Sequence, residues 1–212
     1  MFGLLSIYHA KKLEAKLLYF VGMMVFFTGD FYLGASIDFL TVLLTENNIP
    51  NENGLHGILS FMWVAPAVIT AMYLGSYLII PSKKWYILSL YLTLAVVFEF
   101  FLFIDPLSAF NFEIPPGRTL IDSSFVYGSI TFILIVVFLA SALIFTGVGF
   151  LIKSIQSTGA VRKRFAFLSI GFIVFVICGA LDSLVAPGLG LIIVRGGMIC
   201  YAWFMYFGLK TA

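Results

Sequence analysis

Charged residues are scarce in this chain, and their scarcity excludes a water-exposed fold. Only 10% of the 212 residues are Asp, Glu, Lys or Arg, whereas 62% are hydrophobic, and the mean hydropathy is +1.10. A soluble domain carries about 25% charged residues because its surface must be solvated. The composition therefore indicates an integral membrane protein in contact with the lipid bilayer. With 12 basic and 10 acidic residues, the chain has no strongly basic surface, and we expect no nucleic-acid partner.

Cysteine and histidine are also rare, and their positions exclude several kinds of site. Cys178 and Cys200 lie within apolar runs, where cysteine behaves as a small buried hydrophobe, so there is no disulfide framework. His9 and His56 are expected on opposite sides of the membrane, which excludes a histidine metal site within one chain. The sequence also lacks the short motifs of hydrolases, kinases and thiol redox enzymes. We therefore expect no catalytic residues, no metal and no cofactor.

Six apolar stretches are long enough to cross a membrane as helices. A spanning helix needs about 20 mostly apolar residues, because hydrocarbon cannot hydrogen bond to the backbone. Turn-forming residues such as Pro50, Pro81 and Pro187 separate the stretches. The sequence thus predicts an all-α bundle of six spans in one domain, residues 17–212, preceded by a cytoplasmic segment, residues 1–16. The predicted spans are 17–44, 57–80, 85–104, 124–152, 165–185 and 189–209.

The loop charges are distributed unequally across the predicted membrane. Most of the basic residues would lie on the side of the two termini, whereas the loops on the opposite side are mainly acidic. Because cytoplasmic loops are enriched in Lys and Arg, this asymmetry predicts a multi-pass protein of the cell membrane with both termini in the cytoplasm. The basic residues on the terminal side are Lys11, Lys12, Lys16, Lys83, Lys84, Lys153, Arg162, Lys163, Arg164 and Lys210.

Small residues recur at helical spacing in the second predicted span. Ala67, Ala71 and Gly75 follow one another every four residues, which lets two helix backbones approach closely. This spacing predicts a helix-packing seam, either within the chain or between the protomers of a homo-oligomer.

Five ionisable residues fall inside the predicted spans, where a charge is unfavourable. A charge at the bilayer centre costs ~2.5–3.5 kcal/mol even on the lenient insertion scale, so such groups normally face the bundle interior and have a partner. They are therefore our candidate site residues. These residues are Asp30, Asp38, Glu99, Asp182 and Arg195.

The depth of these residues predicts that four of the five share one level near the outer ends of the helices. Asp182 and Arg195 flank the tight turn between the last two spans, so they can pair across a helical hairpin. Asp38 and Glu99 are expected at the same level and would complete a cluster. Asp30 lies nearer the middle of the bilayer.

Two interpretations of these charges remain open. They are consistent with an ion-pair network that only holds the helices together. They are also consistent with a binding site, because three acids facing one cation leave a negative excess that suits a small polar or cationic ligand, or a proton.

Several short segments carry a resemblance to a known family. Residues 30–34, Asp-Phe-Tyr-Leu-Gly, precede a polar outer loop, and residues 61–66 read Phe-Met-Trp-Val-Ala-Pro. Residues 181–187, Leu-Asp-Ser-Leu-Val-Ala-Pro, are followed by Gly196-Gly197 and Tyr201-Ala202. In layout, this arrangement resembles the seven-helix N-terminal membrane sensor region of prokaryotic histidine kinases.

The resemblance implies a sensory function that depends on another protein. Relative to that family, the first span is missing or reduced to residues 1–8, and no kinase domain follows the last span. The resemblance therefore implies a ligand-binding membrane module whose signalling partner, in the membrane or in the cytoplasm, is a separate chain.

We accordingly expect a sensor in which a ligand binds among Asp38, Glu99, Asp182 and Arg195. The alternative, from a different functional class, is a small secondary transporter coupled to protons or cations. In such a carrier, Asp30 would be accessible alternately from the two sides of the membrane. A structural subunit of a larger membrane complex is the third possibility.

Overall fold

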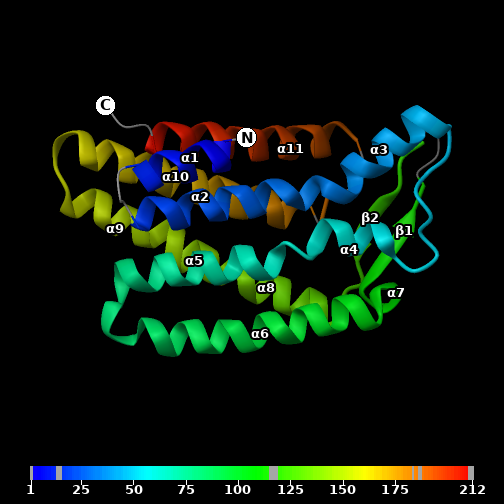
Figure 1. Cartoon of the computed structure of the whole chain (residues 1–212), viewed down its shortest axis with the longest axis horizontal. Helices are drawn as coiled ribbons and strands as arrows, with labels where there is room; N and C mark the ends of the chain where they lie inside the picture. The colour runs from blue at the N-terminus through cyan, green and yellow to red at the C-terminus, as the bar shows by residue number, and fades with distance from the viewer. Residues whose placement is uncertain (1, 13–15, 115–118, 183, 186–187, 210–212) are drawn as a thin grey trace.

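In the computed structural model, which describes residues 2–12, 16–114, 119–182, 184–185 and 188–209, long helices run side by side in one bundle (Figure 1). Six helical segments are long and apolar enough to cross a membrane. The expected helical architecture with six spans is therefore confirmed. The six segments are Lys16–Thr45, Leu55–Ile79, Pro81–Ile104, Ile130–Gln156, Gly159–Asp182 and Leu189–Leu209.

The two ends of the bundle differ in charge. The basic end contains the connections between α5 (Val64–Ile79) and α6 (Lys84–Ile104) and between α9 (Gly149–Gln156) and α10 (Gly159–Asp182). It carries Lys16, Lys83, Lys84, Lys153 and residues 162–164. The opposite end, called the loop end below, carries the two short strands and acidic loops (Figure 1). Between the ends the surface is apolar, with exposed side chains such as Leu90, Val96 and Phe103 on α6, which supports contact with lipid.

The first span consists of α2 (Lys16–Gly29), a 3₁₀ turn, η1 (Asp30–Tyr32), and α3 (Leu33–Thr45). A further helix, α1 (Phe2–Lys12), lies antiparallel along α2 (Figure 1). Glycines permit this close approach, because a Cβ atom on Gly3 would lie 2.6 Å from the backbone nitrogen of Phe26. The segment expected to precede the spans is thus largely a helix that packs on the first span.

The second span is interrupted between α4 (Leu55–Phe61) and α5 (Val64–Ile79). Pro66 lies in the first turn of α5. Proline has no amide hydrogen, and its ring clashes with the carbonyl group four residues earlier, here that of Met62. A regular helix therefore cannot continue through Met62 and Trp63, and a new helix begins at Val64.

A β-hairpin separates the third and fourth spans. The third span comprises the 3₁₀ turn η2 (Pro81–Lys83) and α6 (Lys84–Ile104), and a short helix, α7 (Pro106–Ala109), follows it. Strands β1 (Phe110–Glu113) and β2 (Asp122–Phe125) then pair antiparallel, with Phe110 opposite Phe125. Both rings pack against Phe61 of α4, with centroid distances of 4.8 and 4.6 Å. The apolar stretch expected from residue 124 therefore begins as a strand, and its helix starts at Ile130.

The remaining helices complete the bundle. The fourth span contains α8 (Ile130–Ala142), a π-helical segment, η3 (Leu143–Val148), and α9 (Gly149–Gln156). Helices α10 (Gly159–Asp182) and α11 (Leu189–Leu209) form a closely packed hairpin. Gly197 permits this packing, since a Cβ atom there would lie 2.5 Å from the sulfur of Cys178.

The predicted small-residue seam lies inside the chain. Ala67 and Ala71 are 4% exposed, and both line a small apolar cavity of about 50 Å³ beside Thr146 of η3. A Cβ atom on Gly75 would lie 2.5 Å from the Cβ of Phe145 and 2.6 Å from its carbonyl oxygen. The seam therefore packs α5 against the π-helical segment of the fourth span.

We expect Gly75→Leu to destabilise the bundle. The new side chain would overlap backbone atoms of Phe145, and overpacking of this kind typically costs about 1–3 kcal/mol. Thermal unfolding of the purified protein in detergent measures the effect. Gly196→Leu is the matched control, because a Cβ atom there meets no neighbouring atom within 4 Å. Equal melting temperatures for the two variants would contradict this packing.

Candidate functional site

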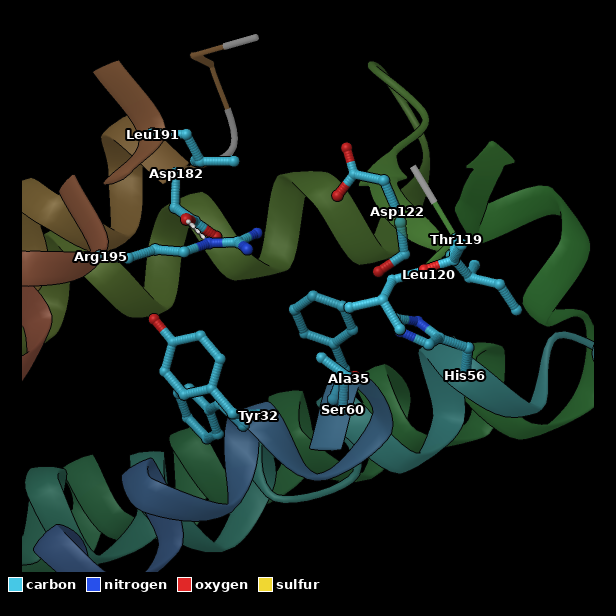
Figure 2. A pocket seen from close by; sticks show the side chains of 14 residues that line it. Tyr32, Ala35, His56, Ser60, Thr119, Leu120, Asp122, Asp182, Leu191 and Arg195 are labelled. Carbon is cyan, nitrogen blue, oxygen red and sulfur yellow. Dashed lines mark hydrogen bonds and ion pairs between the residues drawn. The ribbon is translucent and has the colours of Figure 1, made fainter. Parts of the chain in front are cut away.

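A cavity of about 440 Å³ lies at the loop end of the bundle (Figure 2). Its walls come from η1, the start of α3, α4, residues 119–123, the end of α10 and the first half of α11. These elements belong to different spans, so the cavity exists only in the assembled bundle. We call it the loop-end cavity.

One wall of the loop-end cavity contains an ion pair between the last two helices. The Nε atom of Arg195 lies 3.2 Å from Oδ1 of Asp182. Figure 2 shows the guanidinium group of Arg195 extending into the cavity beyond this contact. The side chains are 45% and 29% exposed, so the pair is open to a molecule entering the cavity. The structure thus contains the pair expected across the hairpin.

The opposite wall contains a buried histidine. His56 is only 3% exposed, and neither of its ring nitrogens has a hydrogen-bond partner among the described residues. Its ring points toward the middle of the cavity (Figure 2). Asp122 of β2 also lines the cavity. Because an unsatisfied buried polar group costs about 1–3 kcal/mol, the imidazole ring is positioned for a partner that a bound molecule can provide.

Asp38 has a different environment from the other expected site residues. Its side chain is fully buried, and its two oxygens accept hydrogen bonds from the backbone amides of Ile49, at 3.0 Å, and Ile121, at 2.9 Å. The side-chain amide of Asn48 lies 3.1 and 3.2 Å from the same oxygens and donates also to the carbonyl oxygen of Thr119. Asp38 therefore joins α3 to two loops, and it does not line the loop-end cavity.

Glu99 and Asp30 lie outside the cavity as well. Glu99 of α6 faces the start of α5, where its carboxyl group interacts with the backbone amide of Ala65. Its Oε1 atom is buried and has no hydrogen-bond partner among the described residues. Asp30 is half-buried in η1.

The structure therefore does not bring the four residues expected at one level into one cluster. Asp182 and Arg195 line the loop-end cavity, whereas Asp38, Glu99 and Asp30 occupy three separate environments. Sequence depth places residues along the axis of a helix, but it does not determine which way each side chain points.

Sequence analysis did not predict three titratable residues of the cavity, His56, Tyr32 and Asp122. His56 was considered only as a metal ligand and was excluded as such. Tyr32 was considered only within the segment 30–34 that resembles the sensor family. Asp122 was counted as a loop charge, although β2 places it in the cavity wall. The available signal for His56 was its position at the start of an apolar stretch, far from the basic end.

The described part of the chain contains no group of three or more His, Cys, Asp or Glu residues close enough to hold a metal ion. Comparison with protein-family models, with curated proteins and with solved structures finds no match for this chain.

We expect Asp38→Asn to loosen both loops at this end of the bundle. Asparagine has a similar shape, but its NH₂ group cannot accept a hydrogen bond, so at least one donor is left unsatisfied, at a cost of about 1–3 kcal/mol. Hydrogen exchange should accelerate at the amides of Ile49 and Ile121, and the melting temperature should fall. Glu113→Gln, which neutralises an exposed acid of β1, is the control. Unchanged exchange at both amides would show that Asp38 does not hold the loops.

Proposed function

We propose that this protein is a recognition module of the cell membrane, with both termini in the cytoplasm, that binds a small polar ligand in the loop-end cavity. The observation that carries the proposal is the buried His56, whose two ring nitrogens have no hydrogen-bond partner among the described residues, in a cavity of about 440 Å³. That volume lies within the range of about 300–1,000 Å³ that is typical of small-molecule sites.

The polar groups of the loop-end cavity favour a ligand that carries both donors and acceptors. Asp182 occupies the Nε atom of Arg195, and the terminal nitrogens of the guanidinium group can donate to a ligand oxygen. Asp122 can accept hydrogen bonds from a ligand amine. His56 can donate or accept, depending on which ring nitrogen carries the proton.

The construction of the walls supports a sensor. The Asp38 carboxylate fixes residues 119–121 to α3, whereas α11 contributes the exposed Arg195 side chain to the opposite wall. A ligand that bridges the two walls would favour one separation between them and so shift the populations of two packing states. We propose that a separate protein detects this shift, as the resemblance to sensor regions implies.

A secondary transporter is the second candidate, and one observation favours it. The second span is broken at Met62 and Trp63, and the carboxyl group of Glu99 lies against the first turn of the new helix. Broken helices and intramembrane carboxyl groups are features of ion-coupled carriers. In that function, Glu99 would bind the coupling proton or cation.

We expect Ala35→Phe to abolish ligand binding, because Ala35 lines the loop-end cavity and a phenyl ring there would fill it. Native mass spectrometry after extraction in mild detergent measures any molecule that the protein retains. Ser36→Phe adds the same ring at a neighbouring exposed position of α3 and should leave binding unchanged. A wild-type protein without a bound molecule, or retention by Ala35→Phe at the wild-type level, would contradict the proposal.

Proton flux distinguishes the two candidates. If the protein is a recognition module, liposomes that contain it should show no more proton uptake than protein-free liposomes under an imposed cation gradient. Uptake that is present in the wild type and lost in Glu99→Gln would instead favour the carrier. Both measurements use a pH-sensitive dye inside the liposomes.

A further inference from the structure

A second hollow adjoins the loop-end cavity and opens on the side of the bundle. This hollow, of about 370 Å³, lies between α2 and α11, and its walls include Val25 and Gly29 on one side and Ile199 and Ala202 on the other. We call it the lateral groove. A Cβ atom on Gly29 would meet no neighbouring atom within 4 Å, so the space beside this glycine is open.

Tyr32 and Arg195 line both hollows and therefore mark their junction. Arg195 is six residues into α11, about 9 Å from the start of the helix, and Ala202 is about 10 Å deeper. The junction is thus near the loop end of the bundle, and the lateral groove extends from it along the apolar part of the spans. An apolar space at this depth is accessible to lipid chains and not to bulk water.

The charges follow a definite order from the lateral groove into the loop-end cavity. Arg195, at the junction, is the one charged residue among the described residues that line the groove, and the hydroxyl groups of Thr28 and Tyr201 bond to each other. Of these two hollows, Asp182, Asp122 and His56, whose ring nitrogens have no partner among the described residues, line the loop-end cavity and not the lateral groove. A molecule that occupies both hollows thus meets an apolar wall first, then a cation, and finally acids and an imidazole ring.

We infer that the ligand of the loop-end cavity is a zwitterionic phospholipid with a primary ammonium head group. One acyl chain occupies the lateral groove, the phosphate group accepts hydrogen bonds from Arg195, and the ammonium group donates to Asp122 and His56. This inference rests on the proposed function and extends it, because the polar group bound in the loop-end cavity is then the head group of a larger amphipathic molecule. Arginine suits phosphate because its planar guanidinium group presents several donors to the phosphate oxygens.

The order of charges favours this occupant over the others. An anionic phospholipid with an uncharged head would supply no cation to Asp122 in the loop-end cavity. A trimethylammonium head has no N–H donor for the carboxylate or the imidazole ring. A water-soluble ligand has no apolar chain that would occupy the lateral groove. A helix from a second copy of the chain would cover the groove but would not supply an ammonium group to the loop-end cavity.

The test is native mass spectrometry of the full chain, stripped of lipid and mixed with equal amounts of three lipids with identical acyl chains: phosphatidylethanolamine, phosphatidylcholine and phosphatidylglycerol. We expect the wild type to retain phosphatidylethanolamine about tenfold better than either of the others, as expected from the loss of one charge-assisted hydrogen bond. Asp122→Asn should remove this preference, whereas Glu113→Gln, at the exposed position that pairs with Asp122 in the hairpin, should preserve it.

The lateral groove is tested separately by Gly29→Leu, which fills the open space, with Gly196→Leu as the control on the facing helix. Retention of phosphatidylethanolamine should fall about tenfold in Gly29→Leu and stay at the wild-type level in Gly196→Leu. Melting temperatures of both variants show whether the fold is intact. If Gly29→Leu does not fold, Asp122→Asn tests the inference by itself: loss of the preference for phosphatidylethanolamine supports it, and an unchanged preference overturns it.

The other outcomes overturn the inference in distinguishable ways. Equal retention of the three lipids, or undiminished retention by a folded Gly29→Leu, would show that no head group is recognised through this groove. Dimers that Gly29→Leu converts to monomers would identify a second copy as the occupant. A water-soluble molecule that Gly29→Leu retains and Ala35→Phe loses would overturn the inference and leave the proposed function intact. The absence of any bound molecule would overturn both.

Discussion

The loop-end cavity depends on the solvation of one buried carboxylate, that of Asp38. Removing such a charge from water costs several kcal/mol, and excellent hydrogen-bond geometry must offset that cost. Here the N–H donors come from the loop after α3 and from the segment before β2. Because a single carboxylate requires both, the two segments are held against the same helix. Residues 119–123 then form one wall of the cavity.

The other walls are held by weaker or less specific contacts. Phe61, Phe110 and Phe125 pack the hairpin on α4 through their rings, and this packing fixes the position of Asp122. The wall formed by α11 presents a half-exposed ion pair instead, and such pairs contribute little to stability. The cavity thus combines a well-anchored side with a side that can adjust to an occupant, which suits a protein that reports binding through a change in helix packing.

Hydropathy predicted the spans, and the repeat of small residues predicted the packing seam, because both patterns depend on local sequence. The six spans follow from the length of the apolar stretches, and the hairpin of α10 and α11 follows from the short turn between them. The β-hairpin was not predictable, because Ser124 and Phe125 continue into an apolar stretch and strand pairing involves residues far apart. Asp38 was misjudged for a similar reason, since its donors lie in loops whose conformation no periodicity describes. His56 gave only the signal of its position at the start of an apolar stretch, because a single histidine forms no repeating pattern.

The pairing of Asp182 with Arg195 has a consequence for the biosynthesis of the protein. A lone arginine in the last helix would enter the bilayer at a cost of ~2.5–3.5 kcal/mol. The two residues are only 13 positions apart, on helices joined by a short turn, so their charges can neutralise each other before the rest of the bundle has packed. The last two spans are therefore suited to partition into the membrane together, as a preassembled helical hairpin. On this route, Arg195 reaches the cavity wall already accompanied by its counter-ion.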